Sequence, residues 1–134
     1  MKIAICIDDR NGRSFNKRRQ SRDRKLIEDL AAYVNEGRIF MNSYSAPLFA
    51  DFADKIEVRD DFLEAAGEND VCFVETTDIT PYADRIDHII LYRWNRHYPS
   101  DKKLELDLSQ YTLVSSCEFA GSSHENITRE ELSR

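Results

Sequence analysis

The sequence has few of the residues that interrupt regular structure, with four glycines and three prolines among 134 residues. No stretch is of low complexity or linker-like, and no apolar run approaches the roughly 18 residues that a membrane-spanning helix needs. The short apolar run at residues 1–7 is followed by Asp8, Asp9 and Arg10 rather than by a signal-peptide cleavage site. These absences predict one folded domain over residues 1–134, located in the cytoplasm and without membrane contact.

Motifs for metal binding and for known enzyme classes are also missing. Cys6, Cys72 and Cys117 lie in separate apolar or strand-like segments, which is typical of reduced thiols and not of a zinc site. The three histidines are equally far apart: His88, His97 and His124. There is no GxGxxG, Walker or GxSxG motif, and no serine or cysteine stands at a recognisable spacing from a histidine. We therefore expect no metal site.

Strand-like and helix-like segments alternate along the chain. Apolar positions three and four apart predict a helix over residues 23–34, with Gly37 as its stop. Shorter helices are predicted at residues 45–53, at 62–66 and after Thr80, and strands at residues 2–8, 38–44, 55–58, 71–74, 88–94 and 111–119. This alternation is typical of an α/β fold with three layers and a largely parallel central sheet.

The end of the chain departs from this alternation. No helix is predicted between the strands at 88–94 and 111–119, so we expect these two to pair antiparallel at one edge of the sheet. The tail at residues 125–134 is open to two interpretations. Its residue propensities favour a helix, whereas Ile127 in a short segment after Gly121 fits an edge strand.

The order of these segments resembles dihydrofolate reductase along most of the chain. The strings DLAAY (29–33) and RIFMNSYS (38–45) are similar to that family's first helix and the strand after it. EVRDDFLEAAGENDVCFVE (57–75) resembles its short helix and the strand before its paired glycines, and ADRIDHIILYRW (83–94) and LDLSQYTLVSS (106–116) resemble its last two long strands. The resemblance implies a dihydrofolate reductase-like fold and places Asp29 where that family has its substrate carboxylate.

The residue types at that family's cofactor-binding positions differ in this sequence. The family's paired glycines let the backbone approach the cofactor pyrophosphate, but the matching positions look like Glu75, Thr76 and Thr77. A carboxylate repels a pyrophosphate, and β-branched threonines resist the positive φ that glycine permits. The glycine-arginine pair after the second strand is likewise replaced, by Asn42 and Ser43. We therefore expect no nicotinamide cofactor.

Part of such a site could still bind an anion. Ser45 precedes Ala46 and Pro47, as a helix N-cap does, and it is either a cap alone or part of an anion site at that helix start. The candidate ligand-binding residues are Asn42, Ser43, Ser45, Glu75, Thr76 and Thr77. The alternative is an NADPH-dependent reductase with a site rearranged around Asn42, Ser45 and Thr76, in which Asp29 assists protonation.

Residues 10–25 form a dense cluster of positive charge. Eight basic residues against Asp23 give this segment a charge of +7, so the remainder carries −13. The segment is either a solvated loop paired with acidic surface of the same or another subunit, or an anion-binding site. The candidate anion-binding residues are Arg13, Lys17, Arg18, Arg19 and Arg22.

Two nucleic-acid interpretations of this segment are weaker. RNA binding would use phosphate contacts and stacking on Phe15, but the acidic remainder disfavours a broad nucleic-acid footprint. The run NKRRQSRD also resembles short chains that carry a ribonuclease Z name, yet that zinc nuclease family depends on an HxHxDH cluster that this sequence lacks. The sequence thus favours a binding or regulatory protein that engages an anionic small molecule or a protein partner, with a homo-oligomer as a further option.

Overall fold

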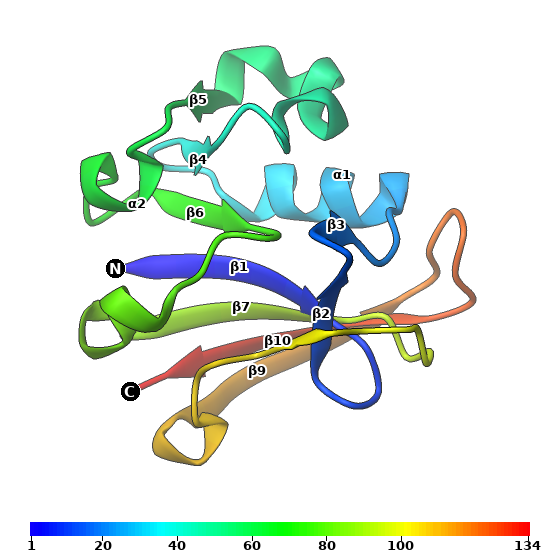
Figure 1. Cartoon of the computed structure of the whole chain (residues 1–134). Coiled ribbons are helices and arrows are strands. Elements are labelled where there is room, and N and C mark those ends of the chain that lie inside the picture. Colours follow the sequence, from blue (N-terminus) through cyan, green and yellow to red (C-terminus); the bar gives the residue numbers. More distant parts are fainter.

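The computed structural model describes residues 1–134 and contains two sheets (Figure 1). The large sheet consists of β1 (Lys2–Ile7), β4 (Ile39–Met41), β5 (Ile56–Val58), β6 (Val71–Val74), β7 (His88–Arg93), β9 (Thr112–Phe119) and β10 (Ile127–Ser133). Its seven strands follow the order β5-β4-β6-β1-β7-β10-β9. The strands from β5 to β7 are parallel, and β10 runs antiparallel to both of its neighbours.

Helices cover both faces of the large sheet. One face carries α1 (Arg24–Tyr33) and the 3-10 helix η1 (Ala46–Lys55), which pack through Leu26, Leu30 and Phe49. The other face carries α2 (Phe62–Ala65) and the 3-10 turn η2 (Thr80–Arg85). A further turn, η3 (Leu108–Gln110), packs on this face through Leu108. A second buried cluster on that face includes Leu63 and Ile79. The predicted three-layer α/β fold is confirmed. No helix has the length and apolar character needed to cross a membrane.

The predicted helix at residues 23–34 forms α1, but it ends four residues before Gly37. Asp23 is its N-cap, since the carboxylate accepts hydrogen bonds from the backbone N–H groups of Lys25 and Leu26. The helix ends at Tyr33, and Gly37 serves the turn into β4 instead. Gly37 has φ +72°, and a Cβ atom there would lie 2.3 Å from the Asn69 carbonyl oxygen. Only glycine fits this turn.

The prediction that the strands now seen as β7 and β9 pair with each other is wrong. The tail forms β10, which lies between them and pairs with both (Figure 1). Ile127 and Leu132 on β10 are buried. Burial of these apolar side chains between two strands outweighs the helix propensity of the residues between them. The edge-strand interpretation of the tail is also wrong, because β9 and not β10 lies at the edge.

The basic segment is more ordered than a solvated loop. It contains β2 (Gly12–Phe15) and β3 (Arg18–Arg19), which form a hairpin, and β2 also pairs with β8 (Lys102–Lys103). The hairpin turns at Asn16 and Lys17, both with positive φ, as in a type I′ two-residue turn. This small sheet crosses over the carboxyl end of β1 (Figure 1), so it lies against the end of the large sheet where the candidate ligand residues stand.

Candidate functional site

The candidate ligand residues lie where β4 and β6 end. These strands are parallel neighbours, so the segments that follow them meet at one edge of the sheet. Asn42 Nδ2 donates to Thr77 Oγ1 at 3.3 Å, and Ser45 Oγ donates to Glu75 Oε1 at 2.8 Å. The structure therefore brings together four of the six candidate residues, two from each segment.

Arg19 of the hairpin closes this edge. Its Nε and Nη2 atoms donate to the two carboxylate oxygens of Glu75 at 2.7 and 2.9 Å, and Nη2 also donates to the Tyr44 carbonyl oxygen at 3.1 Å. The guanidinium lies 4.3 Å from the Tyr44 ring centroid. The hydrogen bonds that Arg19 donates to Glu75 raise the pKa of Arg19. Glu75 is 9% exposed and Arg19 23%. Both charges are thus neutralised within the chain.

Arg13, a second candidate anion-binding residue, is also engaged internally. Its side chain is fully buried, and Nη1 donates to both carboxylate oxygens of Glu105 at 2.8 and 2.9 Å. Nη2 donates to the Thr77 carbonyl oxygen at 2.9 Å. Burial lowers the pKa of Arg13, and Glu105 partly opposes this effect. Arg13 therefore ties the hairpin to the segment that follows β6.

The other candidates remain open to solvent to different degrees. Lys17, Arg18 and Arg22 are exposed and take part in no ion pair of the chain. Ser43 is exposed and Thr76 half-buried.

Ser45 occupies the N-cap position of η1, but its side chain makes no capping hydrogen bond. The expectation that this hydroxyl caps the helix is wrong, because it donates to Glu75 instead.

Asp29 faces the sheet, where it is held by two partners. Arg129 Nη1 donates to both of its carboxylate oxygens at 2.7 Å, and the Tyr92 hydroxyl donates to Oδ2 at 2.7 Å. Burial and the neighbouring Asp29 carboxylate raise the pKa of Tyr92 far above its usual value. The carboxylate thus has a bound cation and a bound hydroxyl where the resemblance implies a substrate. Its predicted catalytic role stays a prediction.

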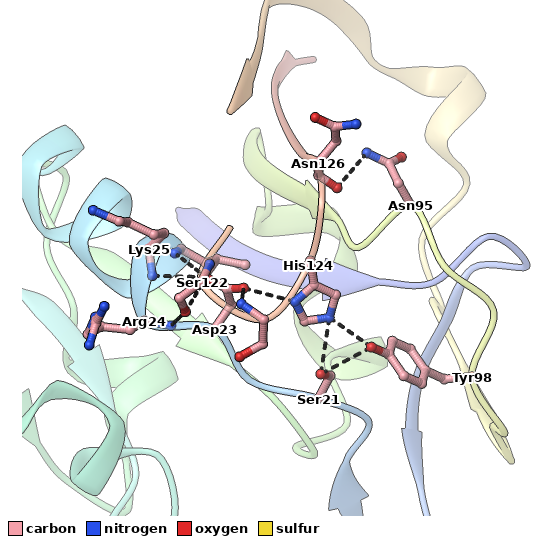
Figure 2. A network of polar contacts seen from close by, with 11 residues as sticks. Ser21, Asp23, Arg24, Lys25, Asn95, Tyr98, Ser122, His124 and Asn126 are labelled. Atoms are coloured by element: carbon pink, nitrogen blue, oxygen red, sulfur yellow. Dashed lines mark hydrogen bonds and ion pairs between the residues drawn. The ribbon is translucent and has the colours of Figure 1, made fainter. Parts of the chain in front are cut away.

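A separate polar network lies at the start of α1 (Figure 2). Asp23 accepts hydrogen bonds from the backbone N–H groups of Ser122 and Ser123 at 2.9 and 2.7 Å and from His124 Nδ1 at 2.9 Å. Burial alone would raise the pKa of Asp23, but these hydrogen bonds outweigh it and hold the pKa well below its usual value. Asp23 is therefore an anion with its acceptor positions filled.

The other ring nitrogen of His124, Nε2, lies close to two hydroxyl groups. This atom lies 3.2 Å from Ser21 Oγ and 2.7 Å from the Tyr98 hydroxyl (Figure 2). Sequence reasoning missed this arrangement, because Asp23 and His124 stand 101 residues apart and match no family spacing. They meet because the segment between β9 and β10 folds back to the start of α1. No group of three or more His, Cys, Asp or Glu side chains is placed to hold a metal ion.

Comparison with solved structures gives a match, and it shows the fold alone. No protein-family model matches the sequence, and no curated protein matches it. Among solved structures, dihydrofolate reductase from Enterococcus faecalis, in complex with NADP(H) and RAB-propyl, matches with a TM-score of 0.68 at 9% sequence identity. The match covers 100% of this chain and 96% of that one. The chain thus has the dihydrofolate reductase-like fold that its order of strands and helices predicted.

Proposed function

We propose that this protein is a dihydrofolate reductase-like domain that does not use a nicotinamide cofactor and that works as a binding or regulatory protein for an anionic partner. The observation that carries the proposal is the contact of Arg19 and Ser45 with Glu75. In open parallel sheets, ligands bind beyond the carboxyl ends of the strands. Here the chain's own hairpin and a carboxylate occupy that position.

Entry of a pyrophosphate at this edge would be unfavourable for two reasons. The phosphates would compete with Glu75 for Arg19, and a Glu75 released from Arg19 would keep only the Ser45 hydroxyl as a partner. A poorly exposed carboxylate without its cation is strongly destabilised. It would also repel the incoming phosphates at short range. The site is therefore suited to the internal ion pair and not to a dinucleotide.

The exposed basic side chains supply the surface for a partner. Lys17, Arg18 and Arg22 belong to the segment of charge +7, while the remainder of the chain carries −13. A short anionic molecule or an acidic patch on a protein could contact these side chains alone. A long polyanion would also approach the acidic remainder and be repelled there. This contrast favours a small anion or a protein partner over RNA.

The cofactor part of the proposal is tested by adding millimolar NADPH to the protein and following thermal unfolding and the fluorescence of the buried Trp94. We expect neither a shift in melting temperature nor quenching, whereas a ligand at 100 times its Kd adds about 2.7 kcal/mol to the free energy of unfolding. The Glu75→Gln variant is the matched control, because it keeps the size of the side chain and removes its charge. A saturable shift in the wild type would support the reductase alternative and reject the proposal.

The RNA alternative has its own test. We expect fluorescence anisotropy with a short single-stranded RNA to show no tight binding, even at low ionic strength, where phosphate contacts are strongest. The triple variant Lys17→Ala, Arg18→Ala, Arg22→Ala serves as the comparison, because it removes exposed charges and leaves the contacts of Arg13 and Arg19 in place. Tight binding by the wild type that weakens steeply with salt and disappears in the triple variant would make RNA the partner.

A further inference from the structure

Ser21, His124 and Asp23 stand in the order hydroxyl, imidazole, carboxylate (Figure 2). Asp23, held as an anion, can only accept, so the proton of the neutral imidazole lies on His124 Nδ1, 2.9 Å from Oδ2. The lone pair of Nε2 then faces Ser21 Oγ at 3.2 Å. This is the arrangement by which a histidine base, oriented by a carboxylate, activates a serine hydroxyl.

The base in this arrangement is held firmly. The His124 side chain is 1% exposed, and its ring stacks on Trp94 with centroids 4.6 Å apart. Asp23, the positioning residue, is fixed in turn by the backbone N–H groups of Ser122 and Ser123. Because both groups are fixed before any substrate arrives, the imidazole needs no rearrangement to accept a proton.

Ser21 is half-buried and lines a cavity of about 20 Å3 whose apolar wall includes Leu48, Phe73 and Trp94. A cavity of this size holds about one or two water molecules, so only a short acyl group such as acetyl could extend into it. Arg22, the next residue, also lines the cavity, and its backbone N–H has no acceptor among the loop and turn hydrogen bonds. That N–H, one residue along the chain from Ser21, is a free donor for a carbonyl oxygen that becomes negative.

We infer that Ser21 is a nucleophile for acyl transfer from esters with a short acyl group. Ser21 Oγ forms a bond to the carbonyl carbon while its proton passes to His124 Nε2, and the ester C–O bond breaks as the leaving oxygen takes that proton. A water molecule then attacks the acyl-serine by the same proton path and releases the carboxylic acid. This inference rests on the contacts among Ser21, His124 and Asp23, none of which carries the binding function proposed above.

Tyr98 lowers the reactivity of Ser21. Its hydroxyl lies 2.7 Å from His124 Nε2, closer than Ser21 Oγ, and 3.3 Å from Ser21 Oγ itself. One imidazole lone pair serves two hydroxyl donors, so the tyrosine competes with the serine for the base. Removal of the Tyr98 hydroxyl leaves Ser21 as the sole donor and increases the nucleophilicity of Ser21.

The test uses the full chain with a fluorophosphonate probe, which labels activated serines, and with p-nitrophenyl acetate. We expect the probe to label Ser21, identified by peptide mass spectrometry, and the Tyr98→Phe variant to react several-fold faster. Ser21→Ala abolishes labelling and ester hydrolysis. His124→Asn, whose amide can still donate to Asp23 but which has no base at the Nε2 position, lowers both rates by about 10²- to 10⁴-fold.

Ser115→Ala is the matched control, because Ser115 is an exposed serine whose hydroxyl contacts Glu131 and no histidine. It leaves both rates unchanged. The inference is overturned if the folded wild type and Tyr98→Phe both fail to react with the probe, or if labelling persists in Ser21→Ala.

Discussion

Replacement of Asp23 by alanine is expected to lower the free energy of unfolding by about 3–5 kcal/mol, which corresponds to a fall in melting temperature of about 10–20 °C. The carboxylate caps α1 and accepts hydrogen bonds from Ser122, Ser123 and His124. Its loss leaves several buried donors without an acceptor at once. Chemical denaturation followed by circular dichroism measures the change.

The control for this variant is Asp107→Ala. Asp107 also accepts a hydrogen bond from a backbone N–H at the start of a helical turn, that of Ser109, but it is exposed. We expect a loss of about 1 kcal/mol or less there. If the two variants were equally stable, the network around Asp23 would contribute nothing beyond a helix cap.

Asp23 also makes the stability of the wild type depend on pH in the acidic range. Its pKa in the folded protein lies below that of the unfolded chain, so its contribution to stability is complete above about pH 4 and is lost as the pH falls through the folded value. The stability of Asp23→Ala should depend less on pH in that acidic range. An identical acid dependence in both proteins would contradict this assignment.

Replacement of Arg19 by alanine is expected to cost about 1–3 kcal/mol, because Glu75 would remain poorly exposed with only Ser45 as a partner. The neighbouring Arg18→Ala is the matched control. Arg18 is exposed and unpaired, so its loss should change stability by about 0.5 kcal/mol or less.

A double-mutant cycle with Arg19→Ala and Glu75→Gln isolates the pair itself. We expect an interaction free energy of about 1–3 kcal/mol, since the two residues are in bidentate contact. Additive effects of the two substitutions would show that the hairpin is not held on the sheet edge by this ion pair.

The layers of the fold were predictable from local pattern, while the role of the tail was not. Apolar runs such as 71–74 mark strands buried on both faces, and the spacing of Leu26, Leu30 and Val34 marks a helix face, because burial imposes these periods. Ile127 and Leu132, by contrast, stand in a polar tail whose propensities favour a helix. Their strand exists because both neighbouring strands are available to pair with it.

The location of the candidate site was predictable from the sequence, but the side chains that contact its residues were not. Asn42, Ser45, Glu75 and Thr77 meet because they follow neighbouring parallel strands, which the order of elements already implied. The choice of Arg19, and not Arg18, as the cation for Glu75 depends on the two-residue turn at the hairpin tip. The meeting of Ser21 with His124 depends on where the segment between β9 and β10 returns to the start of α1. Neither position is encoded in any local pattern.

We propose that the chain's own Arg19 and Glu75 occupy the edge at which a dinucleotide would otherwise bind. The most direct measurement is a crystal structure of the protein grown with millimolar NADPH. We expect Arg19 to remain in bidentate contact with Glu75 and no cofactor to lie between the ends of β4 and β6. A bound NADPH at that edge, with Arg19 turned from Glu75 to its phosphates, would contradict it.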